Sequence, residues 1–351
     1  MNVSVFSAQD FEQPFLHAAA GSRHQLRLLK MPLTTDTAHL AEGSAGVSVF
    51  SPDDVSEPVL EQLLAHGVRC VAVRAAGYDN VDLAAARQMG IQVANVPDYS
   101  PYAIAEHAVG LMLTLARHLR QADQQLRAHD FRLDQLIGFD LNGKTVGLLG
   151  VGRIGAVVAR ILHGFGCHLL GVDLQPNEEL TRRYDLAYVP LAELCARADI
   201  ISIHLPLTPA TRYLVNDQLL GGLKPGAMLI NTGRGGVLDT AATLRALASG
   251  RLGSLGLDVY EHEKGLFFRD HRQAPPRDET FAQLLACPNV HVTGHQAYLT
   301  REALTNIADA TMASFDAWAA GRPAPHELTA GPNPAPAPTA TRPRHVPVSA
   351  S

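Results

Sequence analysis

Three polar residues in the second half of the chain have side chains suited to acid–base chemistry on a charged substrate. Arg234, Glu263 and His295 each come shortly after an aliphatic run typical of a β-strand. Open parallel sheets bind ligands at the carboxyl ends of their strands, so the three side chains are expected to meet at one edge. A histidine can deliver a proton near neutral pH, a carboxylate partner favours its protonated form, and the planar arginine fork suits a substrate carboxylate.

Each of these residues, taken alone, also has an ordinary structural explanation. Arg234 could cap a helix, and Glu263 belongs to the run 261–263, which could be solvated. His295 is one of 16 histidines, most of which are expected at the surface or in satisfied core positions. The three together, behind a nucleotide-binding motif, favour a catalytic role.

That motif is the glycine-rich string at residues 150–155, which directly follows the aliphatic run 145–149 and opens a helix-compatible stretch. The pattern alone is weak, because glycines are common in turns. In a dinucleotide site Gly150 makes the tight turn, Gly152 lets the backbone approach a pyrophosphate, and Gly155 lets the helix pack on the strand. The amide groups at the helix N-terminus then face the phosphates.

Asp173 supplies the acid that a dinucleotide site requires after its second strand, here the run 168–172. Its carboxylate can accept hydrogen bonds from ribose hydroxyls and repels a 2′-phosphate. Residues 174–176 contain no Arg that could bind such a phosphate, so NAD is favoured over NADP. The alternative is an Asp that only caps a turn or helix.

The elements that must position these residues form an alternation of strands and helices, the pattern of an α/β protein with parallel sheets. At 351 residues the chain is more than twice the length of about 150 residues that serves as a prior for one domain, and we expect two lobes. The first set of predicted strands lies near residues 2–6, 26–30, 46–50, 69–73 and 91–94. The second set lies at residues 145–149, 168–172, 200–204, 227–231, 253–257 and 290–293.

Two helices connect these sets. Ser100 as N-cap and Pro101 at the first position start a helix, whose apolar periodicity continues to Leu119 and becomes polar by Gln124. We expect it to carry the chain from the first lobe to the second. A helical pattern at 302–321 returns the chain and makes the first lobe discontinuous. Residues 331–351 contain six prolines in 21 residues and are predicted to be a disordered tail.

Composition and charge exclude several classes of protein. With 29 basic and 34 acidic residues and a net charge of −5, the chain has no basic excess for nucleic acid. No apolar run approaches the roughly 18 residues of a membrane span, and the first residues lack the pattern of a signal peptide, so we expect a cytoplasmic protein. Its four cysteines are too far apart for a metal or redox motif, and we expect reduced core thiols.

The motifs together resemble those of the NAD-dependent D-2-hydroxyacid dehydrogenases, over about residues 1–328. The strings that carry the resemblance are 150–155, 231–235, 257–263 and 294–297, and Glu263 and His295 follow Arg234 by 29 and 61 residues, close to the family's spacing. Within the family the chain most resembles the fermentative D-lactate dehydrogenases, through residues 99–101, 104–107, 265–268 and 294–300. Many glycerate and phosphoglycerate relatives have Pro directly after the catalytic Glu and Ile directly after the catalytic His. This chain has Lys264 and Gln296 at those two places.

The resemblance implies an α/β fold with two lobes, a Rossmann NAD-binding lobe and a flavodoxin-like substrate lobe. It places the substrate lobe at 1–100 and 298–330 and the NAD-binding lobe at 101–297. It assigns catalysis to Arg234, Glu263 and His295 without a metal. The loop 74–82 resembles the family's carboxylate loop, and the implied substrate contacts are Ala76, Gly77, Tyr99, Arg234 and Tyr298. The implied cofactor contacts are Gly150, Gly152, Arg153, Ile154, Gly155, Asp173, Leu205, Pro206, Thr211, Thr232, Gly233 and Asp258.

The resemblance also implies an activity: reversible reduction of pyruvate to D-lactate with NADH, in a cleft that closes by hinge motion. It implies a homodimer or homotetramer, with contacts through the helix at 101–128. A broader reductase for bulkier 2-oxo acids is the first alternative. An NAD-sensing regulatory protein of the same fold is a second alternative, and a Rossmann methyltransferase is a more remote one.

Overall fold

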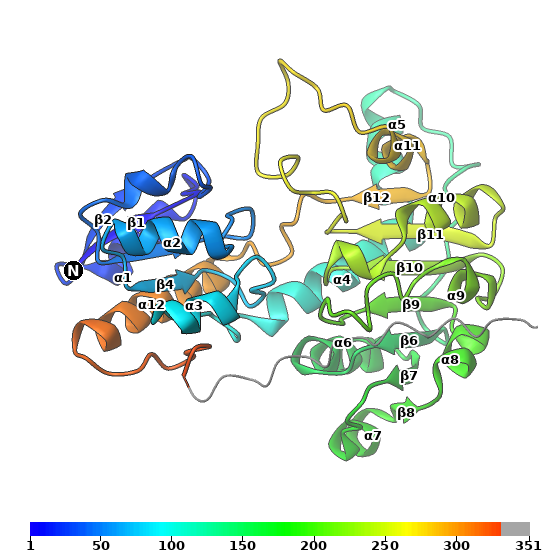
Figure 1. The fold of residues 1–351 in the computed structure, drawn as a ribbon. Coiled ribbons are helices and arrows are strands. Elements are labelled where there is room, and N and C mark those ends of the chain that lie inside the picture. The colour runs from blue at the N-terminus through cyan, green and yellow to red at the C-terminus, as the bar shows by residue number, and fades with distance from the viewer. Residues whose placement is uncertain (331–351) are drawn as a thin grey trace, which may run out of the picture.

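Short runs of Val, Leu, Ile and Ala form two separate parallel sheets in the computed structural model, which describes residues 1–330 (Figure 1). The first sheet has five strands in the order β2-β1-β3-β4-β5, the order of flavodoxin-like sheets. Its strands are β1 (Asn2–Val5), β2 (Gln25–Leu28), β3 (Gly46–Val49), β4 (Cys70–Val73) and β5 (Gln92–Ala94). All five were predicted. Four of them are largely buried hydrophobic runs, whereas the edge strand β2 is partly exposed.

The second sheet has seven parallel strands in the order β12-β11-β10-β9-β6-β7-β8. This is the Rossmann order with a seventh strand added at one edge. The strands are β6 (Thr145–Leu149), β7 (His168–Val172), β8 (Ala187–Tyr188), β9 (Ile200–Ile203), β10 (Ala227–Asn231), β11 (Leu252–Leu257) and β12 (Val290–Val292). The edge strand β8 was not predicted, because two residues carry no periodic signal.

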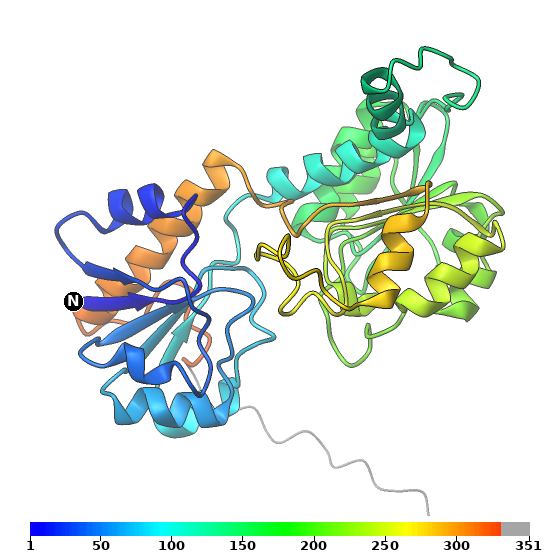
Figure 2. The ribbon, with the colours of Figure 1, turned by 90° about the horizontal axis from the view of Figure 1, so that it is seen from above.

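Helices cover the faces of both sheets, so the predicted α/β fold with two lobes is confirmed (Figures 1 and 2). The first lobe has α1 (Gln13–Ala20), α2 (Glu57–Ala65), α3 (Leu83–Met89) and α12 (Arg301–Ala319), with a 3-10 turn η1 (Ala38–Ala41). The second lobe has α4 (Pro101–Ala116), α5 (Leu119–Arg127), α6 (Arg153–Gly164), α7 (Glu178–Tyr184), α8 (Leu191–Arg197), α9 (Asp217–Gly221), α10 (Thr240–Ala248) and α11 (Glu279–Ala286), with a 3-10 turn η2 (Gly235–Val237).

The chain returns to the first lobe through α12, as predicted. Met312 and Phe315 of this helix are buried in a core cluster with Val3 and Val5 of β1. Beyond the helix, the N–H of Leu328 donates to Val93 O at 2.7 Å and continues the edge of the first sheet. The boundaries of the two lobes at residues 100/101 and 297/298 stay a prediction.

The prediction of one uninterrupted helix over residues 101–128 is wrong. Ser100 caps the start by accepting from the N–H of Ala103, but α4 ends at Ala116. The reason is a tertiary contact: the N–H of Phe139 donates to Ala116 O at 3.0 Å. The segment before Phe139 folds against this helix end so closely that a Cβ on Gly138 would lie 2.1 Å from the same oxygen. His118 then adopts a left-handed φ of 51°, and α5 starts in a new direction.

Three of the four cysteines are buried thiols, as predicted, but Cys287 is half-buried at the end of α11, so the core assignment is wrong for it. Burial raises the pKa of Cys70 to about 12 and that of Cys167 to about 11. Within residues 1–330 no helix is long and apolar enough to cross a membrane, and no cluster of His, Cys, Asp and Glu could hold a metal ion. The predicted tail at 331–351 lies outside the described residues.

Candidate active site

A cleft of about 610 Å³ lies between the two lobes at the carboxyl ends of their strands. The second lobe contributes the glycine loop, the loop after β9 and the loop after β10, and the first lobe contributes the loops after β3, β4 and β5. Thirteen of the residues singled out from the sequence line it: Ala76, Gly77, Tyr99, Gly152, Arg153, Ile154, Leu205, Pro206, Thr232, Gly233, Arg234, His295 and Tyr298.

The His295 imidazole is paired with the Glu263 carboxylate. Nδ1 of His295 lies 2.8 Å from Oε1 of Glu263, and the second carboxylate oxygen accepts from the N–H of Tyr260 at 3.1 Å. Because an ionised carboxylate only accepts, Nδ1 carries the proton in this pair. Nε2 is then the ring nitrogen available to a ligand in the cleft. The two side chains are 17% and 24% exposed, so the ion pair is partly shielded from water.

Arg234 lies against the loop after β4. Its Nε donates to Asp79 Oδ1 at 3.3 Å, and one terminal nitrogen donates to Gly233 O at 3.0 Å. An ideal Cβ on Gly77 would lie 1.6 Å from the other terminal nitrogen, so a side chain at this position would displace the guanidinium. The guanidinium of the second lobe and the backbone of the first lobe therefore form one wall of the cleft.

The loop at 75–79 offers unpaired backbone donors toward that wall. The N–H groups of Ala76 and Gly77 donate to no acceptor within residues 1–330, while Ala76 O accepts from the Asn95 side chain at 2.7 Å. Free, adjacent N–H groups beside a guanidinium form a site for an anion. This geometry fits the carboxylate loop that the resemblance implied.

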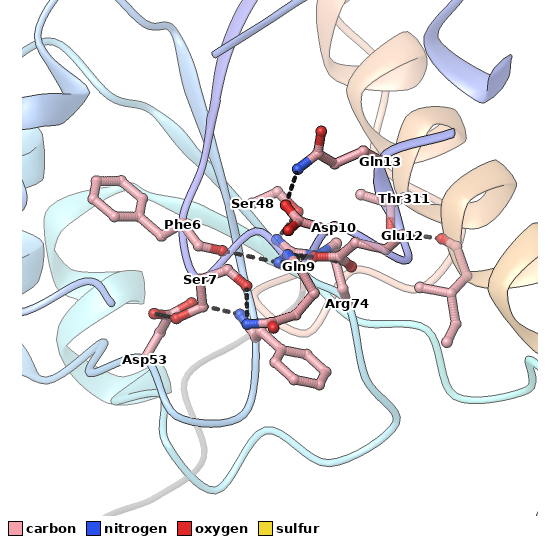
Figure 3. A network of polar contacts seen from close by, with 12 residues as sticks. Phe6, Ser7, Gln9, Asp10, Glu12, Gln13, Ser48, Asp53, Arg74 and Thr311 are labelled. Atoms are coloured by element: carbon pink, nitrogen blue, oxygen red, sulfur yellow. Dashed lines mark hydrogen bonds and ion pairs between the residues drawn. The ribbon is translucent and has the colours of Figure 1, made fainter. Parts of the chain in front are cut away.

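A buried ion pair anchors the start of this loop. Arg74 is fully buried at the end of β4, where its guanidinium donates twice to Glu12 at 3.1 Å, to Ser48 Oγ at 3.0 Å and to Phe6 O at 2.9 Å (Figure 3). Figure 3 shows Asp53 near this network, where it accepts from Ser7 Oγ at 2.6 Å. The start of the loop 75–79 is therefore fixed by a charged hydrogen-bond network as well as by apolar packing.

Aromatic side chains close the other side of the cleft. Tyr298 contacts Phe50 and Tyr99, with ring centroids 6.0 and 6.4 Å apart, and Phe268 lies 5.7 Å from His295. Burial raises the pKa of Tyr99 to about 12, and it raises the pKa of Tyr298 as well. Both hydroxyls stay protonated at neutral pH and can donate to a substrate.

The glycine loop has the shape that a dinucleotide requires. Gly150 has a φ of 87°, and a Cβ on Gly155 would lie 2.3 Å from Gly150 O, so the helix packs directly on the turn. A Cβ on Gly152 would meet nothing within 4 Å and would point into open space at the start of α6. This space fits a pyrophosphate bound by the amides of the helix N-terminus.

Asp173 lies directly after β7, beside the glycine loop. Its Oδ2 accepts from the N–H of Val151 at 2.6 Å and its Oδ1 from the N–H of Gln175 at 2.9 Å. Each oxygen keeps a lone pair for a further donor. The carboxylate therefore orients the glycine loop and can also accept from a ribose hydroxyl.

Six of the residues singled out from the sequence do not line the cleft: Gly150, Gly155, Asp173, Thr211, Asp258 and Glu263. Thr211 donates to Pro206 O at 2.6 Å and so fixes the loop that does line it. Asp258 is 1% exposed, and its carboxylate accepts from the backbone N–H groups of Gln296 and Ala297 at 2.9 and 2.8 Å. Its direct contact with a cofactor stays a prediction.

Sequence reasoning missed several cleft residues. Phe50, Asp79 and His204 line the cleft. Phe50 and His204 were placed inside the predicted strands 46–50 and 200–204, but in the structure they follow β3 and β9, while Asp79 belongs to the loop 74–82. Position at the carboxyl end of a strand was the available signal, and among single side chains it was applied only to Asp173, Arg234, Glu263 and His295. His204 is the most unusual of these residues, because burial lowers its pKa to about 4. Its Nε2 lies 2.9 Å from Ser202 Oγ.

Comparison with known proteins agrees with this geometry. The family model for the D-isomer specific 2-hydroxyacid dehydrogenase NAD binding domain matches residues 109–297. The chain is 44% identical to a D-lactate dehydrogenase of Curvularia clavata, over 95% of this chain and 97% of that relative. It is 42% identical to the D-lactate dehydrogenase of Escherichia coli K12, over 93% and 100%. The solved structure of the pyruvate reductase of Chlamydomonas reinhardtii matches with a TM-score of 0.87 and 40% identity, over 93% and 98%.

Proposed function

Because this chain belongs to the D-isomer specific 2-hydroxyacid dehydrogenase family, we propose that it reduces pyruvate to D-lactate with NADH. Membership makes it an NAD-dependent oxidoreductase acting on 2-hydroxy acids. The observation that carries the choice of reaction is the His295–Glu263 pair, 2.8 Å apart, in the cleft that also holds Arg234. Relatives named D-lactate dehydrogenase and pyruvate reductase support pyruvate as the substrate.

The residues divide the chemistry as follows. Bound NADH supplies the hydride that C2 of the 2-oxo acid receives. His295 gives its Nε2 proton to the carbonyl oxygen, and Glu263 stabilises the protonated ring before that transfer. In lactate oxidation the neutral ring takes the hydroxyl proton back. No metal is required, because the imidazolium and the guanidinium polarise the carbonyl.

The Arg234 guanidinium and the backbone of the loop 75–79, which form one wall of the cleft, orient the substrate. The Arg234 guanidinium provides a planar pair of donors for the carboxylate of the substrate. The free N–H groups of Ala76 and Gly77 bind the same carboxylate from the first lobe. Since the two sets of donors belong to different lobes, the substrate itself joins them and favours the closed cleft.

The test is NADH oxidation by the purified full chain with a panel of glyoxylate, pyruvate, 2-oxobutyrate, 2-oxoisocaproate and phenylpyruvate. We expect the highest kcat/KM with pyruvate. A maximum at the bulkier acids would replace the proposal with the broader reductase. Binding of NADH without turnover of any acid would replace it with an NAD-sensing protein.

We also propose that the protein is a homodimer or homotetramer in the cytoplasm. The apolar surface that supports an oligomer lies on α5 and the following segment, where Phe131, Leu133 and Ile137 are 69%, 73% and 83% exposed. Large exposed apolar side chains gathered in one segment are typical of an interaction site. The contact predicted through the helix at 101–128 therefore shifts toward its second half and the loop beyond it.

A further inference from the structure

His107 lies on α4 and reaches the turn that presents His295, although it does not line the cleft. Its Nε2 is 3.0 Å from Thr293 Oγ1 and 3.5 Å from Asp258 Oδ1, and its side chain is 21% exposed. His107 therefore contacts the turn 293–297, which carries His295, from the side away from the cleft.

The hydrogen bonds of this cluster have one consistent direction. The Thr293 hydroxyl lies 2.6 Å from Asp258 Oδ1, and the buried carboxylate also accepts from the N–H groups of Gln296 and Ala297. Since a carboxylate only accepts, the one Thr293 proton points to Asp258. The Thr293 oxygen then accepts, and His107 must donate to it from a protonated Nε2.

The turn that this cluster holds is strained at the catalytic residue. His295 has a φ of 54°, a left-handed conformation that is uncommon for a residue other than glycine. Its own N–H donates to Asp258 O at 2.7 Å. Strain of this kind persists only where surrounding contacts determine the backbone, and here those contacts converge on Asp258 and Thr293.

We propose that His107 is a positioning residue for His295. The hydrogen bond from His107 Nε2–H to Thr293, and the one from Thr293 to Asp258, fix the turn 293–297. The His295 ring then keeps Nδ1 on Glu263 and Nε2 toward the substrate. The helix that carries His107 begins at Pro101, directly after the segment that connects the lobes. The contact therefore ties the connection between the lobes to the proton donor, an inference that rests on the proposed function.

Two substitutions at His107 separate this role from simple packing. His107→Leu keeps an apolar body and loses the donor, whereas His107→Gln keeps an N–H at similar reach. We expect His107→Leu to lower kcat for pyruvate at least tenfold with KM for NADH within twofold, and His107→Gln to retain most of the activity. A packing role predicts the reverse order. Thermal unfolding of both variants checks that they are folded.

Thr293 supplies a matched pair. Thr293→Val should lose kcat to the same degree as His107→Leu, Thr293→Ser should retain it, and the double variant with His107→Leu should lose no more than either single change. Full kcat in His107→Leu, or additive losses in the double variant, would overturn the proposal.

A measurement without turnover distinguishes this inference from the proposed function. In ¹⁵N-histidine-labelled protein, the His107 resonances are identified by their loss in His107→Gln, and we expect neutral His107 to carry its proton on Nε2. A proton on Nδ1 would overturn the positioning role even in an active enzyme. An inactive parent with the Nε2–H form would instead contradict the proposed function alone.

Discussion

The smallest arrangement on which the proposed chemistry depends is the pair of His295 and Glu263. The sequence indicated it through spacing and residue type, and the structure places the two side chains 2.8 Å apart. Their catalytic roles stay predictions. What sequence reasoning could not supply is the strained backbone of His295 and the cluster behind it, because these depend on contacts between residues 107, 258 and 293 on three different elements.

Glu263→Gln tests the pair through the pH dependence of both reaction directions. Without the carboxylate the protonated ring is less stable, so it loses its proton at a lower pH. The alkaline limb of pyruvate reduction should move to lower pH, and the acidic limb of lactate oxidation should move the same way. His295→Gln is the control and should depress both directions at every pH. Profiles of Glu263→Gln that overlay those of the parent would contradict the pairing.

Two glycines of the 150–155 loop make a matched pair for the cofactor site. Gly152→Ala adds a methyl group that meets no protein atom within 4 Å, so unfolding should be unchanged, while the affinity for NADH should fall at least tenfold. Gly155→Ala places its methyl 2.3 Å from a backbone oxygen and should lower stability as well. NADH fluorescence titration and thermal unfolding measure the two effects. Unaltered NADH affinity in Gly152→Ala would place the pyrophosphate elsewhere.

At the scale of elements, the buried strands were predictable and the interruptions were not. Eleven of the twelve strands within residues 1–330 were predicted, and β2 and β11 each begin one residue earlier than expected. The break between α4 and α5 depends on Phe139 and Gly138, which lie more than 20 residues from the helix end that they contact. Local periodicity cannot register such a contact, because the apolar pattern continues through Leu119.

The carboxyl end of β9 carries a pH-dependent contribution to stability. His204 has a pKa lowered to about 4 by burial, and Nδ1 is buried without a partner within residues 1–330. In the unfolded chain His204 binds a proton below its ordinary pKa of 6.5, whereas in the folded protein it stays neutral down to about pH 4. The stability that the neutral folded form contributes is therefore present above pH 6.5 and is lost as the pH falls from 6.5 toward 4. Between pH 7.5 and 5 the loss should be about 1 to 2 kcal/mol.

Urea unfolding of the parent and of His204→Gln at the two pH values measures this contribution. The variant should lose less stability than the parent between them. The exposed His262, 64% accessible in its side chain, gives a control variant, His262→Gln, that should behave like the parent. Equal pH dependence in all three proteins would show that His204 titrates normally in the folded state.

For the whole molecule, two lobes meet at a cleft whose walls come from both. Arg234 of the second lobe contacts Asp79 of the first at 3.3 Å, and Arg153 contacts Asp98 at the same distance. Sequence reasoning predicted both lobes and the return of the chain through α12. It did not predict these bridges, because they depend on how the lobes face each other rather than on any local pattern.

The apolar surface beyond α5 makes a prediction about assembly. Phe131→Asp together with Ile137→Asp introduces charge where an apolar contact is proposed, and should reduce the parent oligomer to a single chain of 37.6 kDa. Light scattering after gel filtration measures the mass. Leu174, which is fully exposed just after β7, provides the control Leu174→Asp with unchanged assembly. A parent that is itself monomeric, or a double variant that keeps the parent mass, would remove this interface.

The most direct measurement is the identity and configuration of the product that the purified full chain forms from pyruvate and NADH. Chiral chromatography should find D-lactate, one mole for each mole of NADH oxidised, and His295→Gln should form at least a hundredfold less in the same time. L-lactate, a racemic product, or NADH that stays reduced in the presence of pyruvate would contradict the proposed reaction.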